Sequence, residues 1–225
     1  RQDKIPHGLV SAFTYSQLSG SSGASFNSPN FYDYNQYLSQ LVLLAHIVDD
    51  EFHESVQNIF HIDKITKIGK IDFDKTTTNK NKDDDEKQET KHGDGIIEYA
   101  RGPVKLIERA RYKAQTDYAS EPYPASACVL DLNRCSLIFN DISTMLAALQ
   151  IFTDKVNMTS DSGNIIGIAR VKNKFTEYVD EPQYADLKLN VVIKGRQNNI
   201  IGEVQFLLKT MKAFKDRAHN LYAIE

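Results

Sequence analysis

Two apolar runs near the end of the chain constrain the fold more than any other feature of the sequence. They cover residues 186–194 and 199–208, and apolar side chains alternate along the first run from Leu187 to Ile193. The turn at residues 194–199 includes a glycine and two asparagines, which favour turns. Alternation with a period of two is typical of a strand with one buried face. The two runs therefore predict an antiparallel β-hairpin.

Periodicity elsewhere predicts a domain that contains both strands and helices. Three further strands are expected at 127–132, 135–139 and 164–172. Four helices are expected at 33–60, 96–118, 142–152 and 209–224, with Asp141 as the cap of the third. This order indicates an α+β fold, in which a mixed, largely antiparallel sheet is flanked by helices and follows a helical N-terminal segment.

Two polar stretches set the boundaries of this domain. Residues 1–30 lack periodicity and end in a run of Ser, Gly and Ala, so we expect a flexible arm. Residues 74–95 contain no apolar side chain and cannot repay the entropy of ordering, which predicts a disordered insertion. One domain is then expected over 31–225. Because the chain starts at Arg1 rather than Met, we expect it to be part of a longer chain.

Composition narrows the class of protein. The net charge of −3 weighs against a general nucleic-acid binder, which usually carries a strong basic excess. No apolar run approaches membrane-spanning length and no signal-peptide pattern is present, so we expect no membrane partner. The two cysteines, Cys128 and Cys135, are expected to be buried and reduced, as in a cytoplasmic protein.

Two acidic residues lie in runs that otherwise read as buried strands. Asp131 lies in the run 127–132, and Glu203 lies in the run 200–206. A buried carboxylate is costly unless something compensates its charge. A Mg²⁺ ion bound by both acids would do so, since this ion takes one or two carboxylates and leaves its other positions to phosphates. The alternative is a pair of structural carboxylates satisfied by neighbouring arginines.

Basic residues gather in the same half of the chain. They are Lys105, Arg109, Arg111, Lys113, Arg134, Arg170, Lys172, Lys174 and Lys188. Two acids for a metal and several cations for phosphates meet the needs of phosphoryl-type transfer. For Arg109, Arg111 and Lys113 the alternative is a solvated helix face, because Arg109 and Lys113 are helical neighbours.

A second candidate metal site lies on the expected N-terminal helix. His46, Asp49, Asp50 and His53 are spaced i, i+3, i+4 and i+7, so they share one face of that helix. Paired histidines and carboxylates at such spacing can hold a metal ion. The alternative is an ordinary polar helix face, and it is the interpretation that the sequence favours.

Five short motifs follow one another in the second half of the chain. They are Asp131-Leu132-Asn133-Arg134, Arg170-Val171-Lys172-Asn173, Tyr184-Ala185-Asp186, Glu203-Val204-Gln205 and His219-Asn220-Leu221-Tyr222. In this order they resemble the RelA/SpoT-like (p)ppGpp synthetase domain, and more closely its divergent members from protists and algae. The resemblance covers about residues 97–225 and implies the nucleotidyltransferase fold of that family.

The resemblance also implies an activity. The family moves a pyrophosphate from ATP to the ribose 3′-hydroxyl of GDP or GTP with the help of Mg²⁺. By position, Asp131 would bind the metal. Glu203 would be the second acid, which binds the metal or helps to deprotonate the attacking hydroxyl. Tyr184 would stack on the acceptor guanine.

Basic residues receive roles from the same resemblance. Arg109, Arg111 or Lys113 would contact the phosphates and adenine of ATP. Arg134 lies close to where the family has a basic residue near the donor nucleotide. Lys188 stands where the family has a histidine, and it would belong to the nucleotide site.

The chain departs from the family pattern in two further places. It lacks the Lys-x-x-Ser-x-x-Lys segment before the first acid, and Phe206–Leu208 replaces the basic residue that follows the second. Two alternatives therefore stay open. One is a degenerate domain that binds a nucleotide or a protein partner. The other is transfer to a tRNA 3′ end, against which the net negative charge weighs.

Overall fold

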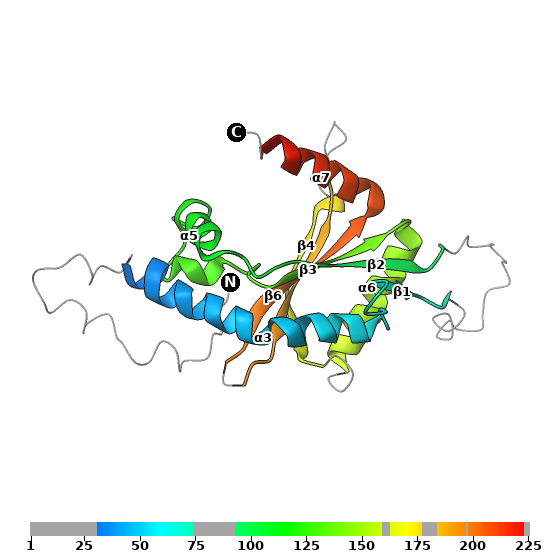
Figure 1. Ribbon diagram of the computed structural model, residues 1–225, viewed down its shortest axis with the longest axis horizontal. Helices are drawn as coiled ribbons and strands as arrows, with labels where there is room; N and C mark the ends of the chain where they lie inside the picture. The colour runs from blue at the N-terminus through cyan, green and yellow to red at the C-terminus, as the bar shows by residue number, and fades with distance from the viewer. Residues whose placement is uncertain (1–30, 74–92, 159–162, 177–183, 197, 223–225) are drawn as a thin grey trace, which may run out of the picture.

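The computed structural model describes residues 31–73, 93–158, 163–176, 184–196 and 198–222. Its centre is a six-stranded sheet with the order β1-β2-β3-β6-β5-β4 (Figure 1). The strands are β1 (Ile68–Lys70), β2 (Ile96–Arg101), β3 (Arg134–Phe139), β4 (Ile165–Asn173), β5 (Leu187–Ile193) and β6 (Ile200–Leu208). Strands β3 and β6 are parallel, and the other described pairs are antiparallel. The mixed, largely antiparallel sheet is therefore confirmed.

Helices flank this sheet, as the sequence predicts. The chain enters through η2 (Tyr32–Tyr37), a π-helical segment that continues directly into α3 (Leu38–Ile59). The later helical elements are α5 (Ile107–Thr116), η3 (Ala125–Cys128), α6 (Ile142–Asn157), η4 (Lys174–Thr176) and α7 (Lys209–Tyr222). Asp141 caps α6 as expected, since its carboxylate accepts a hydrogen bond from the backbone N–H of Thr144 at 2.8 Å.

The C-terminal hairpin is also confirmed. Strands β5 and β6 pair antiparallel, from Ile193 opposite Ile200 to Leu187 opposite Phe206. The strand expected at 164–172 forms β4, which lies beside β5 at the edge of the sheet. Alternation with a period of two from Leu187 to Ile193 predicts β5, and the turn after it predicts its pairing with β6.

The core lies on one face of the sheet, where α3 and α6 pack. The rings of Phe139 on β3 and Phe206 on β6 stack with centres 5.7 Å apart. Phe152 of α6 meets Phe206 edge-on at 6.0 Å, and Phe60, just after α3, stacks on Phe152 at 6.2 Å. Because side chains alternate along a strand, every second residue of β3 and β6 is left on the opposite face.

The helix expected over 96–118 is wrong in its first part. Residues Ile96–Arg101 form β2, in which Ile97 and Tyr99 are buried and their neighbours face the other way. Pro103 follows directly, and a proline disfavours helix at the residue before it. The helix therefore begins only at Ile107.

The strand expected over 127–132 is wrong as well. Its first residues belong to η3, and residues 129–133 belong to no described strand. Val129, Leu130 and Leu132 are buried nonetheless. A short apolar run does not by itself distinguish a buried loop from a buried strand.

Several expectations fall on residues that the structure does not describe. The flexible arm at 1–30 and residues 74–92 of the expected insertion lie outside the described residues, as does the side chain of His219. Within the described ranges, no helix combines the length and the apolar character needed to cross a membrane. Both cysteines are buried and reduced, as predicted.

Candidate active site

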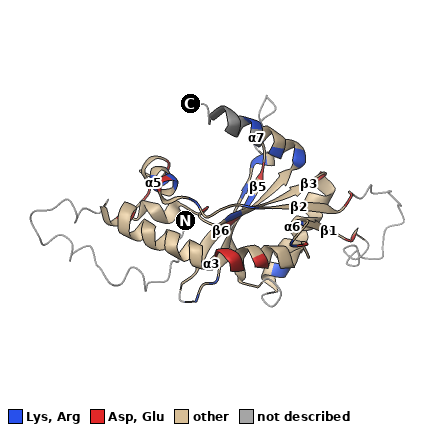
Figure 2. Ribbon diagram, in the orientation of Figure 1, with Lys and Arg blue, Asp and Glu red and all other residues tan. Residues whose placement is uncertain are grey.

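Polar side chains form two rows on the sheet face opposite the core. Residues in register on neighbouring strands point to the same side of a sheet, so their side chains line up across it. The first row consists of Arg170, Asn190, Glu203 and Arg134, and the second consists of Lys172, Lys188, Gln205 and Ser136. Lys and Arg residues gather around β5, β6 and the start of α7 (Figure 2).

Glu203 lies in the middle of the first row and is buried, with 6% of its surface exposed. Its Oε1 accepts a hydrogen bond from Nε2 of Gln205 at 2.5 Å, and Arg134 is its register partner on β3. The backbone N–H of Glu203 donates to the carbonyl of Asn133 at 2.9 Å. Glu203 is thus a buried carboxylate that is bonded to an amide and lies next to the segment that carries Asp131.

Asp131 is held by two lysines rather than by arginines. Its Oδ2 accepts hydrogen bonds from Nζ of Lys105 at 2.7 Å and from Nζ of Lys113 at 2.9 Å. Burial acts to raise the pKa of Asp131, but the two ammonium groups outweigh it and hold this pKa below its ordinary value. Asp131 is therefore an ionised, paired carboxylate at neutral pH.

The pKa values of the two lysines are shifted in opposite directions. Burial lowers the pKa of Lys105 below its ordinary value, even though the charge of Asp131 opposes the shift. Burial acts in the same direction on Lys113, but there the charge of Asp131 prevails and the pKa is raised. Lys113 is thus the more firmly charged partner of Asp131.

The structure separates the three basic residues of α5. Lys113 pairs with Asp131, whereas Arg109 lines a pocket on the polar face of the sheet. Nε of Arg111 donates to the backbone carbonyl of Tyr34 at 3.1 Å. The three side chains therefore do not form one cluster, and Arg111 ties α5 to the N-terminal helix.

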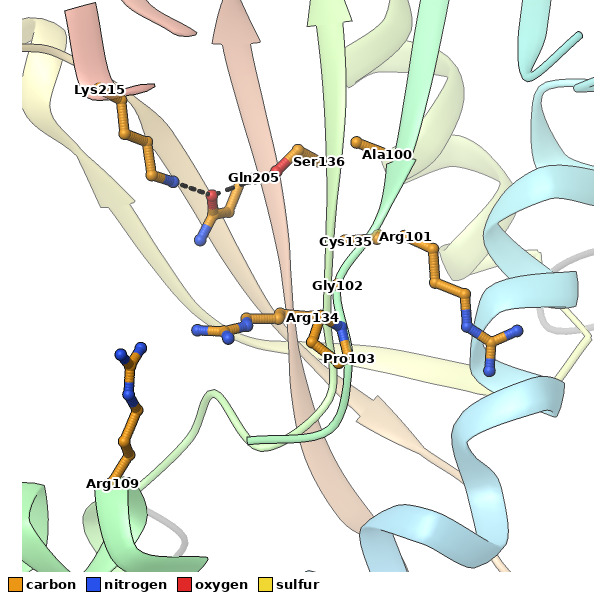
Figure 3. Close-up of a pocket in the computed structure, with 10 residues that line it drawn as sticks. All are labelled: Ala100, Arg101, Gly102, Pro103, Arg109, Arg134, Cys135, Ser136, Gln205 and Lys215. Atoms are coloured by element: carbon orange, nitrogen blue, oxygen red, sulfur yellow. Dashed lines mark hydrogen bonds between the residues drawn. The ribbon is translucent and has the colours of Figure 1, made fainter. Parts of the chain in front are cut away.

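The pocket beside Glu203 has a volume of about 250 Å³ and a basic lining. Arg109, Arg134 and Lys215 extend toward the same open space from α5, β3 and α7 (Figure 3). Arg101 also belongs to the lining, but its guanidinium points away toward α3. Among the described residues, no Asp or Glu lines the pocket. Such a pocket suits a ligand that carries several negative charges.

Lys215 reaches the second polar row from α7. Its Nζ donates to Oε1 of Gln205 at 2.8 Å, and Gln205 in turn bonds Glu203. Burial, followed by the charge of Lys188, lowers the pKa of Lys215 below its ordinary value. This lysine therefore connects the basic pocket with the central acid.

Tyr184 and Lys188 meet at a single buried carboxylate. The hydroxyl of Tyr184 donates to Oδ2 of Asp186 at 2.8 Å, and Nζ of Lys188 lies 3.3 Å from the same oxygen. Burial, followed by the hydrogen bond to Asp186, raises the pKa of Tyr184 above its ordinary value. Nζ of Lys174 lies 5.8 Å from the ring centre, and that of Lys215 lies 6.0 Å from it. The ring is thus fixed in orientation at the edge of the basic face.

Three residues have contacts in this arrangement that the sequence does not predict. Lys105 is expected among the cations for phosphates but pairs with Asp131; it is a single cation within the apolar stretch Val104–Leu106, which is a signal of burial beside an acid. Asp186 directly precedes an apolar strand and is fully buried, which is a similar signal. Lys215 is one of several basic residues on an amphipathic helix, and nothing in its sequence context singles it out.

The acids are compatible with a Mg²⁺ site that substrate phosphates would complete. Oδ1 of Asp131 is buried and has no hydrogen-bond partner among the described residues, so one oxygen remains for a further cation. Glu203 lies on the neighbouring segment, through the bond from its N–H to Asn133. Two carboxylates are enough for an ion that takes its other ligands from phosphates and water. The described residues contain no cluster of three or more His, Cys, Asp or Glu suited to a metal.

The second candidate metal site is used for other contacts. Asp49 accepts hydrogen bonds from the guanidinium of Arg101 and, at 2.8 Å, from Nδ2 of Asn133. Asp50 also binds Arg101, at 2.6 Å. His53 is buried and hydrogen-bonded to the hydroxyl of Tyr99, whereas His46 is exposed. This face of α3 thus holds the sheet in place.

The chain has matches among solved structures but none by sequence. No protein-family model matches the chain, and no curated protein sequence matches it. The structure is similar to small alarmone synthetase 1 from Bacillus subtilis bound to its product pppGpp, with 13% identity and a TM-score of 0.43. It is also similar to small alarmone synthetase 2 from the same organism, with 17% identity and a TM-score of 0.38. Each alignment covers 56% of this chain and 61% of the other.

A third solved structure aligns over more of the chain. It is a GTP pyrophosphokinase family protein from Streptococcus pneumoniae, with 12% identity, a TM-score of 0.43, and coverage of 85% of this chain and 74% of that one. The chain spans only about three fifths of the two alarmone synthetases. Identities and TM-scores this low do not transfer an activity to this chain.

Proposed function

We propose that the protein is a cytoplasmic pyrophosphotransferase, which moves the β- and γ-phosphates of ATP as one group to the 3′-hydroxyl of a guanine nucleotide. The observation that carries this proposal is the basic pocket beside a buried acid. Arg109, Arg134 and Lys215 converge there without an acidic residue in the described lining, and Glu203 is joined to the pocket through Gln205. The cations would neutralise the charge of a triphosphate, and the acid would accept the proton of an attacking hydroxyl.

The triphosphate of ATP is the proposed occupant of the basic pocket. Its charge calls for several cations at separated positions, and the three basic side chains come from three different elements. Arg134 is the register partner of Glu203, so a phosphate bound to Arg134 is brought close to the acid. Such positioning and charge neutralisation supply most of the rate enhancement in phosphoryl transfer.

Glu203 is the proposed general base. It accepts the proton of the acceptor 3′-hydroxyl as that oxygen forms a bond to the β-phosphorus, and the bond from the β-phosphorus to the α-phosphate oxygen breaks to release AMP. Bound Mg²⁺ would neutralise charge on the phosphates, and Asp131 and Glu203 are the residues that would hold it. Lys105 and Lys113 keep Asp131 ionised, as the low pKa of its carboxyl indicates.

The acceptor nucleotide is proposed to lie on the side of Tyr184. The bond from its hydroxyl to Asp186 fixes the ring orientation, which favours stacking of a flat base. Lys188 lies in register with Gln205, between the tyrosine and the central acid, and is placed to bind the acceptor phosphates. Donor and acceptor would then approach Glu203 from opposite ends of the polar face.

A second candidate function is a binding module without catalysis. It is favoured by one observation, namely that Lys105 and Lys113 already neutralise the charge of Asp131 through its Oδ2. In that case the basic pocket would bind a nucleotide and the acids would only shape it. If the protein is catalytic, a tRNA 3′ end is an alternative acceptor to a guanine nucleotide.

Product analysis separates these functions. The purified protein is incubated with labelled ATP, Mg²⁺ and GDP, GTP, ADP or bulk tRNA in parallel, and the products are resolved. AMP release together with a pyrophosphorylated guanine nucleotide is expected, and the Glu203→Gln protein is expected to give neither. A folded protein that binds ATP in calorimetry but forms no AMP with any acceptor would overturn the proposal in favour of the binding module.

A further inference from the structure

The segment that carries Asp131 is not part of the described sheet, so other contacts must hold it in place. This segment, residues 125–133, starts in η3 and ends just before β3. Asp131 lies near its downstream end, where the two lysines reach it. Catalytic geometry is sensitive to shifts of about 1 Å, so an irregular segment needs firm attachment at both ends.

The upstream end is held by Asp33, a buried acid in η2 with 2% of its surface exposed. Its Oδ2 accepts a hydrogen bond from the backbone N–H of Ala125 at 2.6 Å, and its Oδ1 accepts one from the N–H of Ser126 at 3.1 Å. The hydroxyl of Ser126 donates to the backbone carbonyl of Asp33 at 3.3 Å. Hydrogen bonds from backbone donors to a buried carboxylate are among the stronger ones in proteins.

The downstream end is held by Asp49 on α3. Its Oδ1 accepts a hydrogen bond from Nδ2 of Asn133 at 2.8 Å, and the same amide donates to the carbonyl of Ala45 at 2.9 Å. Asn133 is fully buried and lies two residues after Asp131. Its carbonyl accepts the N–H of Glu203, so this residue joins α3 to both acids.

Both attachments come from one continuous helical rod. Asp33 lies in η2 and Asp49 lies in α3, and the first element continues directly into the second. A displacement of this rod therefore acts on both ends of the segment that carries Asp131.

We propose that Asp33 and Asp49 are positioning residues, which hold the two ends of segment 125–133 against one helix and thereby place Asp131 between Lys105 and Lys113. The role assigned to Asp131 rests on the proposed function, whereas the attachment of the segment does not. The N-terminal helix is then a structural part of the active site, although neither acid touches a substrate.

The chain contains its own probe for this attachment. Cys128 lies within the segment and Cys135 lies on β3, and both thiols are buried. Asp33→Asn and Asp49→Asn are prepared together with Asp141→Asn, a control that replaces the capping carboxylate of α6 by an amide and leaves the segment alone. Alkylation by iodoacetamide is followed at each cysteine by mass spectrometry under native conditions.

The expected result is faster labelling at one thiol. Cys128 should react about tenfold faster or more in Asp33→Asn and Asp49→Asn, because each substitution weakens a charge-assisted bond that closes the segment. Cys135 should keep its wild-type rate, and Asp141→Asn should match the wild type at both thiols. Unchanged labelling of Cys128 in both folded variants would overturn the proposal.

Steady-state kinetics test the consequence for Asp131. In both variants kcat should fall about a hundredfold with the KM for ATP within about twofold, because the binding cations stay in place while the acid moves. The control should keep the wild-type kcat per folded molecule. An equal loss of kcat in the control would mean that Asp33 and Asp49 act only through the stability of the fold, which would contradict their positioning role. A wild-type protein without turnover would overturn the proposed function, and the labelling would still decide the attachment. If Asp49→Asn does not fold, Asp33→Asn carries both tests.

Discussion

Arg134 and Glu203 are register partners on the parallel pair β3–β6, so a cation and a buried acid face the same side of the sheet. The arginine points into the basic pocket, and the acid lies beside it through Gln205. Neither residue depends on a flexible loop, since both belong to central strands. This pairing gives the clearest expectations for mutation.

Glu203→Gln should remove activity without unfolding the protein. The amide fills the same space but cannot accept the proton of a hydroxyl, so turnover should fall about 10³-fold. The melting temperature should change little, because the substitution is close to isosteric. Glu98→Gln is a matched control, since Glu98 of β2 pairs at 2.5 Å with Lys209 at the start of α7 and does not line the pocket. Wild-type turnover in Glu203→Gln would contradict the role of this acid as the base.

Arg109→Ala should affect the binding of ATP and Arg111→Ala should affect stability, although the two residues lie close together on α5. Arg109 lines the pocket, so its loss should raise the KM for ATP about tenfold and leave stability unchanged. Arg111 binds the carbonyl of Tyr34, so its loss should cost about 1 kcal/mol of unfolding free energy and leave the KM alone. Steady-state kinetics with varied ATP and urea unfolding would measure both effects. Equal KM values for the two variants would remove Arg109 from the donor site.

Asp131→Asn should destabilise the protein as well as inactivate it. The substitution leaves Lys105 and Lys113 partly buried without their anion, which should cost about 3 kcal/mol. Folding lowers the pKa of Asp131, so its contribution is present above the unfolded value and is lost as the pH falls through the folded one. The difference between wild type and variant should therefore shrink below about pH 4, as urea unfolding at several pH values would show. A pH-independent difference would mean that the ion pairs contribute nothing.

His53 should make the protein less stable in mild acid. Burial lowers its pKa to about 4, against the opposing charge of Asp49, so the folded protein holds this ring neutral where the unfolded chain protonates it. Stability should be fully present above about pH 6.5 and should fall by on the order of 3 kcal/mol between pH 6.5 and 4. His53→Gln should lose less stability over that range, measured by urea unfolding at pH 7.5, 5.5 and 4.5. Parallel curves for the two proteins would contradict the shift.

The C-terminal hairpin could be predicted from the sequence, because apolar side chains alternate along β5 and a turn separates it from the apolar run of β6. Residues of β2 also fit a helix, because Ile97 and Ala100 continue to Val104 and Ile107 with a spacing of three and four residues. Residues 127–132 fit a strand, because burial alone gives the same apolar run.

The acids of the candidate site could be found from the sequence, but their partners could not. Asp131 and Glu203 are each conspicuous in an apolar context. That Lys105 and Lys113 satisfy Asp131 depends on how α5 packs, which no local pattern encodes. Lys215 reaches the site from the last helix, and its role follows only from the way in which α7 leaves β6.

The parallel pairing of β3 and β6 also has a consequence for how the protein folds. These strands are joined by a connection that runs through α6, β4 and β5, and Arg134 and Glu203 are sixty-nine residues apart. Contacts of such long sequence separation form late, because the entropy of closing the loop is spent before they are made. During synthesis, β3 must wait with an open edge until the final hairpin emerges. An open edge invites pairing with another chain, so a ribosome-bound or truncated form that ends before residue 200 should be prone to aggregation.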